Sequence, residues 1–186
     1  MIFESSPWKA SLIRDAGLIS RWAIKPPSAR RSFLIEKKLF LSAYSLRKLS
    51  DDHKLSSATL SAAVSVKIAP ALKKGFSKIR HWPDRYFDME NTVSSTMAWR
   101  RVLNLLIHST VFLEDLGDDG HYGGFWVTSD QEQRRGLIRV DLADIVTLIS
   151  RAAGDYPSAI RHTWISSENR WITWTGHGPI DVEETA

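Results

Sequence analysis

The spacing of apolar residues changes along the chain, and this change limits the folds open to it. Residues 7–23 and about 29–50 carry apolar side chains at helical intervals, and two adjacent prolines separate the segments. We also expect a long helix over about 91–109, with Asn91 or Thr92 as its cap. After this helix, apolar and polar residues alternate as they do in β-strands.

The alternating runs predict an antiparallel part of the fold. They read STVFLED, GGFWVTSD and GLIRVDL, and we interpret them as a three-stranded meander. The segment ADIVTLISRAAGDYP then predicts a helix, and AIRHTWISSENRWITWTG predicts a hairpin that turns at SSEN. An earlier run, SVKIAP at 65–70, could form a short strand.

These patterns together predict an α+β fold. An N-terminal helical bundle is followed by a small antiparallel β-meander and hairpin subdomain with one helix. We expect the basic bundle to cover residues 1–110, the acidic, tryptophan-rich subdomain to cover 111–178 and pack on it, and a loose tail to cover 179–186.

The chain lacks the signals of a membrane or secreted protein. No run approaches the roughly 18 to 20 apolar residues that a membrane span requires, and the N-terminal segment lacks a basic region followed by an apolar one. The absence of cysteine excludes disulfides, thiolate metal sites and cysteine nucleophiles. We therefore expect a cytoplasmic protein.

Charge is distributed unevenly between the two parts. Residues 1–110 hold 19 Lys and Arg against 8 Asp and Glu, whereas residues 111–186 hold 6 against 13. The basic part could bind a polyanion, or the two parts could dock on each other.

A polar stripe lies on the segment RRVLNLLIHS. At 100° per residue, Arg100, Arg101, Asn104 and His108 fall within one arc, and the apolar residues occupy the complementary arc. Asn and His are poor helix formers, so a reason beyond helix formation is expected for them. Asn104 could orient His108 inside a helix contact, or the stripe could be a reactive site.

The reactive interpretation gives each polar residue a role on RNA. Neutral imidazole at His108 can take a proton from a 2′-hydroxyl, and imidazolium can protonate a leaving oxygen. Arg101 or Arg100 would hold the phosphate, and Asn104 would orient the histidine. This chemistry needs no metal.

Arg101, six residues and then His108 resemble the Rx4–6H motif of HEPN domains, helical modules of toxin and phage-defence ribonucleases. The stretch NLLIHS is also similar to the Asn-x-x-x-His form of that motif, with Leu103 where the commonest form has Arg. The resemblance covers about residues 8–110. It implies metal-independent RNA cleavage by His108 and Arg101, Asn104 as the polar motif position, and pairing of two copies around one RNA cleft.

Two basic segments could form an RNA track. One is the second helix and the other is KKGFSKIRHWPDRYF, where cations alternate with rings that could stack on bases. The alternative is that the rings belong to the core and the cations are solvated. The candidate residues are Arg30, Arg31, Lys37, Lys38, Arg47, Lys48, Lys73, Lys74, Lys78, Arg80 and Arg85.

No metal or cofactor is expected. The acidic run EDLGDDGHYGG matches no calcium loop, and we favour an ordinary hairpin loop there. His162 and His177 lack zinc-ligand spacing, and glycines do not cluster as in phosphate-binding loops.

Three tryptophans lie in the expected final hairpin. Alternation places Trp164 opposite the region of Trp171 and Trp174, which predicts a cross-strand aromatic cluster that stabilises a small sheet. The alternative is a protein-interaction surface, because exposed Trp is common at binding hot spots.

The sequence thus favours an HEPN-like, RNA-directed protein, a metal-independent endoribonuclease of a toxin or phage-defence system that could act as a homodimer. The alternative is a non-catalytic adaptor of a multi-subunit bacterial system, which binds nucleic acid through the basic part and protein through the acidic part. A third hypothesis is a protein-interaction module without nucleic acid.

Overall fold

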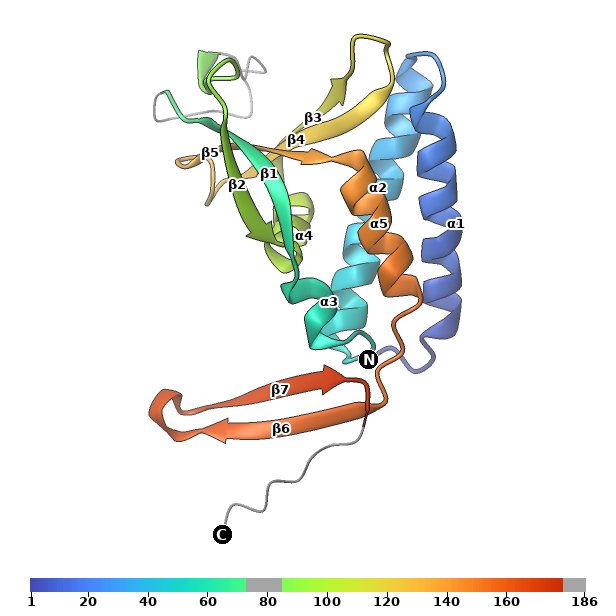
Figure 1. Cartoon of the computed structure of the whole chain (residues 1–186), viewed down its shortest axis with the longest axis vertical. Coiled ribbons are helices and arrows are strands. Elements are labelled where there is room, and N and C mark those ends of the chain that lie inside the picture. The colour runs from blue at the N-terminus through green and yellow to red at the C-terminus, as the bar shows by residue number, and fades with distance from the viewer. Residues whose placement is uncertain (73–84, 179–186) are drawn as a thin grey trace.

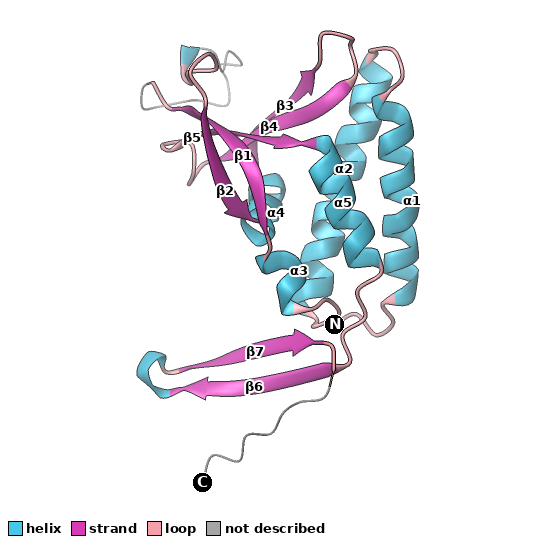
Figure 2. Cartoon of the chain, in the orientation of Figure 1, coloured by secondary structure: helices cyan, strands magenta, loops and turns pink. Residues whose placement is uncertain are grey.

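The computed structural model describes residues 1–72 and 85–178, and it has an α+β architecture (Figure 1). A layer of helices packs on one face of a five-stranded antiparallel sheet, and a two-stranded hairpin extends from the opposite end of the helices (Figure 2). The helices are α1 (Ser6–Ala23), α2 (Ala29–Asp51), α3 (Ser57–Ser61), α4 (Trp99–Ile107) and α5 (Leu142–Ala153). The strands are β1 (Ala63–Pro70), β2 (Val93–Ala98), β3 (Ser109–Leu116), β4 (Tyr122–Ser129), β5 (Gly136–Asp141), β6 (Ala159–Ile165) and β7 (Arg170–Gly176).

The two long N-terminal helices confirm the helical spacing of the sequence. Helix α1 has its proline in the first turn, where the missing N–H costs no hydrogen bond. Helix α2 begins after Ser28, whose hydroxyl accepts a hydrogen bond from the backbone N–H of Arg31. It ends at a turn in which His53 adopts a left-handed conformation, with φ of 58°. Helix α1 buries its apolar stripe against α2 and α5, and α2 buries its own against α1 and α4.

The sheet has the order β2-β1-β5-β4-β3, and each neighbouring pair is antiparallel. The meander β3-β4-β5 is confirmed, and so is the early strand, which is longer than expected. The pairing of β1 with β5, with Lys67 opposite Arg139, joins segments from both sides of residue 110. One hydrophobic core likewise draws side chains from α1, α2, α4, α5 and both sets of strands. The core therefore spans the two parts that the charge pattern distinguishes.

The long helix expected over 91–109 is wrong in its first half. Residues Val93–Ala98 form β2, and only Trp99–Ile107 are helical. The backbone of β2 pairs with β1 along its whole length, and this pairing overrides the helical interpretation of the segment. The N–H of Trp99 donates to the carbonyl of Ala62, which fixes the start of α4 beside β1. The expected helical segment 1–110 thus contains two strands, and an HEPN-like bundle is not confirmed.

The predicted C-terminal hairpin is confirmed, with its turn at Ser166–Asn169. It projects away from the sheet and helices (Figure 1). Thr175 attaches it to the body, because its hydroxyl donates to the carbonyl of Leu55 at 2.7 Å and its N–H donates to Ser57 Oγ at 3.0 Å.

A buried polar cluster fixes the same attachment point. Asp155, only 7% exposed, accepts hydrogen bonds from the N–H and hydroxyl of Ser56 and from the hydroxyl of Thr59, and it lies 2.8 Å from Nε2 of His177. Burial raises the pKa of Asp155, but these hydrogen bonds outweigh it and hold the pKa below its usual value. Lys9, 1% exposed, donates to the Asp155 carbonyl and lies 3.7 Å from the centre of the Tyr156 ring. Burial lowers the pKa of Lys9, and the nearby carboxylate opposes that shift.

None of the described helices is long and apolar enough to cross a membrane. The tail predicted over 179–186 lies outside the described residues.

Candidate functional site

The polar face of α4 borders a groove of about 850 Å³. Helix α2, helix α4, the start of β3 and the turn between β4 and β5 form its walls. Its lining residues are Tyr44, Arg47, Asp51, Arg101, Asn104, Leu105, Ile107, His108, Ser109, Thr110, Ser129, Asp130, Gln131 and Glu132. Three of the four polar residues of the α4 stripe therefore lie in one groove.

His108 ends α4. Its backbone N–H donates to the carbonyl of Asn104 at 3.0 Å, which closes the last turn. Its side chain is exposed, and the imidazole has no hydrogen-bond partner within the described part of the chain. Both ring nitrogens are therefore available to a ligand in the groove.

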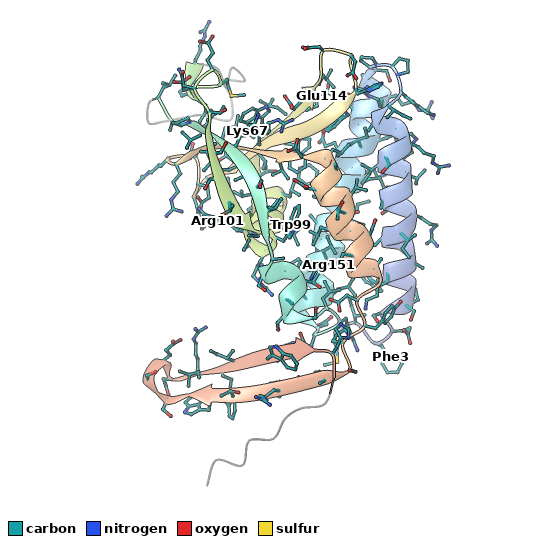
Figure 3. The ribbon with its side chains drawn as sticks, in the orientation of Figure 1. Phe3, Lys67, Trp99, Arg101, Glu114 and Arg151 are labelled. Carbon is teal, nitrogen blue, oxygen red and sulfur yellow. The ribbon has the colours of Figure 1, made fainter. Side chains whose placement is uncertain are left out.

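Arg101 lies one heptad before His108, on the side of α4 opposite the buried Trp99 (Figure 3). Its Nη2 lies 2.6 Å from Oε2 of Glu132, which belongs to the turn between β4 and β5. The same carboxylate lies 3.5 Å from Nη1 of Arg135. Glu132 thus holds the Arg101 guanidinium in place and balances its charge.

Asn104 is bound to α2 and not to His108. Its Oδ1 accepts a hydrogen bond from Nη1 of Arg47, and Nε of Arg47 lies 3.0 Å from Asp51. The expected side-chain contact with His108 is absent from the described structure, because the Asn104 amide turns toward α2. Asn104 therefore joins the two helices across the groove.

Arg100 lies beside the groove and not in its lining. Its Nη2 donates to Ser50 Oγ at 2.8 Å, and its Nη1 lies 3.9 Å from Asp51. The polar stripe thus divides into three groove residues and one arginine that contacts the end of α2.

The groove carries charges of both signs. Arg47 and Arg101 face three carboxylates, Asp51, Asp130 and Glu132, so its formal charge is negative by one when His108 is neutral. Sequence spacing on α4 alone could not reveal these carboxylates, because the fold brings them from α2 and from the turn between β4 and β5. The polar run SDQEQRR of that turn was the available signal.

The predicted basic track is only partly an exposed surface. Arg31 is buried, because its guanidinium donates to the carbonyls of Lys25 and Gly120, and its assignment to a nucleic-acid surface is therefore wrong. Lys38 and Lys48 form ion pairs with Asp15 and Asp52 at 2.6 and 3.3 Å.

The other basic candidates have three different positions. Arg30, Lys37 and Arg85 are exposed, and Arg47 lines the groove. The candidates Lys73, Lys74, Lys78 and Arg80 lie outside the described residues.

The hairpin tryptophans form the predicted cross-strand contact but remain exposed. Trp164 pairs with Trp171 across the two strands, with ring centres 5.4 Å apart. Trp164, Trp171 and Trp174 are 42%, 64% and 43% exposed. Packing between the rings therefore leaves much of their surface open to a partner.

The acidic loop between β3 and β4 makes the contacts of an ordinary hairpin loop. Asp119 in the loop accepts the N–H of His121 at 2.9 Å, and Asp115, which still belongs to β3, lies 2.7 Å from Arg139 of β5. Within residues 1–72 and 85–178, no three His, Asp or Glu side chains group as metal ligands. Comparison with known proteins found no matching family model, no matching curated protein and no matching solved structure.

Proposed function

We propose that this chain is an RNA-directed protein, HEPN-like in its motif, that cleaves phosphodiester bonds without a metal in the groove beside α4. One observation supports this proposal most: the exposed, unpaired imidazole of His108 lines the same groove as the Arg101 guanidinium. A proton-transfer group beside a fixed cation is the minimum that RNA cleavage through the 2′-hydroxyl requires.

The reaction uses one proton twice. Neutral His108 takes the proton of the 2′-hydroxyl, and the 2′-oxygen attacks the adjacent phosphorus. The bond from phosphorus to the 5′-oxygen breaks, and the imidazolium returns its proton to that oxygen. The products are a 2′,3′-cyclic phosphate and a 5′-hydroxyl.

Arg101 stabilises the charge that builds on the phosphoryl oxygens. A guanidinium carries five N–H donors, and the contact with Glu132 engages Nη2, so the other donors can reach the phosphate. Glu132 is the positioning residue, because it fixes the direction of the guanidinium before substrate arrives.

We also propose the biological system in which this activity operates. A cytoplasmic toxin or phage-defence ribonuclease suits the motif resemblance, and two copies would pair around one RNA. The part of the chain after residue 110 would dock a protein partner or regulate the groove.

One observation favours a second candidate, the non-catalytic adaptor. Arg47 and Arg101 are already paired with carboxylates, which lowers the attraction of the groove for phosphate. In that case, the basic surface binds nucleic acid and His108 has no chemical role.

Cleavage of RNA in EDTA separates the two candidates. We expect the wild-type chain to cut a labelled RNA into products that end in cyclic phosphate. His108→Ala should reduce the rate by about 100-fold or more, and Arg101→Ala by a similar factor. The control is His121→Ala, an exposed histidine of the β3–β4 loop, which should cut like the wild type. Equal rates in all four proteins would exclude the groove as the active site.

A further inference from the structure

The β6-β7 hairpin presents an aromatic face that the proposed reaction does not use. Its register pairs Ile160 with Thr175, His162 with Thr173 and Trp164 with Trp171, so these six side chains share one face. Thr175 at the base of this face is buried against α3, whereas the two tryptophans near the turn are exposed. The attached end fixes the hairpin, and the other end carries the rings.

The two rings have a geometry suited to stacking by a further ring. Their planes meet at 59°, so they do not cover one another face to face. A flat apolar ligand can therefore contact each indole separately. Trp174, on the opposite hairpin face, leans over Gly176, where a side chain would collide with its ring.

The neighbours of the rings favour a nucleic acid over an apolar protein surface. Polar His162 and Thr173 adjoin the Trp164–Trp171 pair on the same face. The hairpin, from residue 159 to 176, carries two arginines and one acid, Glu168, so its formal charge is positive by one. The register places Arg161 and Arg170 on the face opposite the tryptophan pair, and Arg170 forms an ion pair with Glu168. Exposed rings beside polar neighbours, on a hairpin of net positive charge, suit a single strand, because every base offers a π-face and every linkage a negative charge.

One residue of the aromatic face, His162, lies near the C-terminal end of α2. The ring of His162 lies 6.2 Å, centre to centre, from that of His53. His53 follows two residues after Asp51, which lines the groove and lies 3.9 Å from Arg100. A strand that leaves the groove along the end of α2 therefore passes Arg100 and His53 before it reaches the hairpin.

We propose that the β6-β7 hairpin is a base-stacking platform for single-stranded nucleic acid, with Trp164 and Trp171 as the stacking rings. The path from the groove rests on the proposed function, because it assumes that the groove holds a phosphodiester. The platform itself is sequence-tolerant, since stacking makes no use of base edges. It supplies affinity that the groove, with its formal charge of minus one, lacks.

The test is the affinity of a 2′-O-methyl oligouridine of about 12 nucleotides, which cannot be cleaved through its 2′-oxygen, measured by fluorescence anisotropy. We expect Trp171→Leu to lower the affinity about 10-fold and Trp171→Tyr to lower it less than about 3-fold, because tyrosine keeps a stacking ring. Trp164→Ala with Trp171→Ala should lower it about 100-fold if the two losses add. The control is Phe33→Ala, which removes an exposed ring from the other end of α2.

A 2′-O-methyl uridine trinucleotide distinguishes binding at the platform from binding in the groove. Its affinity should change less than that of the longer strand in the Trp171 variants if it occupies the groove. Unchanged affinity of the long strand in both Trp171 variants overturns the platform, even where EDTA-resistant cleavage persists. Loss of affinity in Trp171→Leu without any cleavage by the wild type supports the platform and rejects the ribonuclease. Dissociation of a dimer in the double variant, with unchanged RNA affinity, would assign the hairpin to contact between copies and overturn the platform.

Discussion

Asp155→Ala should be among the most destabilising substitutions in the chain. The side chain is buried where α3, α5 and the hairpin meet, and its carboxylate accepts three hydrogen bonds from Ser56 and Thr59. Removal leaves these donors unpaired in a site from which water is largely excluded. It also removes the nearby negative charge that opposes the lowered pKa of Lys9.

The expected loss follows from the number and kind of these contacts. Hydrogen bonds to a charged group contribute about 1.5 to 3 kcal/mol each, and loss of one partner from a buried charged cluster costs about 3 to 5 kcal/mol in all, because the contributions are not additive. With a urea slope of about 2 kcal/mol per molar, the unfolding midpoint should fall by about 1.5 to 2.5 M.

Urea unfolding followed by tryptophan fluorescence measures this shift. The matched control is Asp118→Ala, an exposed carboxylate of the β3–β4 loop, which should change the free energy of unfolding by less than about 0.5 kcal/mol. A midpoint for Asp155→Ala equal to that of the control would refute the assignment of Asp155 as a buried anchor of the hairpin.

Three further outcomes are expected. The folded-state pKa of Asp155 lies below its unfolded value, so its stabilising effect should be complete above about pH 5 and disappear as pH falls through the folded pKa. Stability curves of wild type and Asp155→Ala that stay parallel down to pH 2 would contradict this. Gly136→Ala should cost about 2 to 4 kcal/mol of unfolding free energy, because φ is +147° and an added Cβ would collide with a β1 carbonyl. Gly17→Ala, on the open side of α1, should instead stabilise the protein by about 0.5 to 1 kcal/mol. Thermal unfolding that ranks the two variants in reverse would reject the β1–β5 pairing. Glu132→Gln should release Arg101 and raise the affinity for a short single strand. It should also steepen the slope of log affinity against log salt concentration by about 0.7. An unchanged slope would show that Arg101 does not contact phosphate.

The sequence predicted those parts of the fold that local periodicity determines. Helices α1 and α2, the meander and the hairpin each follow from apolar spacing and from turn residues within the segment itself. Strand β2 did not, because its six residues resemble the start of the helix that follows, and only pairing with β1 makes them a strand. Because β1 lies about 30 residues earlier, the residues of β2 themselves carry no sign of this pairing.

In the candidate site, too, local spacing predicted one part and the contacts made by distant segments decided the rest. One helix face was enough to group Arg101, Asn104 and His108, since their spacing fixes their direction once α4 forms. The partners that decide their chemistry come from elsewhere: Arg47 from α2 binds Asn104, and Glu132 from a turn binds Arg101. Arg31 illustrates the opposite error, because burial between two loops turned an apparently solvated cation into a structural donor.

The most direct test of the account is the NMR spectrum of the histidine rings during titration with a 2′-O-methyl trinucleotide. The chain has six histidines, and a His108→Gln variant assigns the groove resonance. We expect the His108 signal to shift in saturable fashion, the His121 signal to stay unchanged, and Arg101→Ala to weaken the response. A His108 resonance that does not move at trinucleotide concentrations that saturate binding would contradict the claim that this groove holds the phosphodiester.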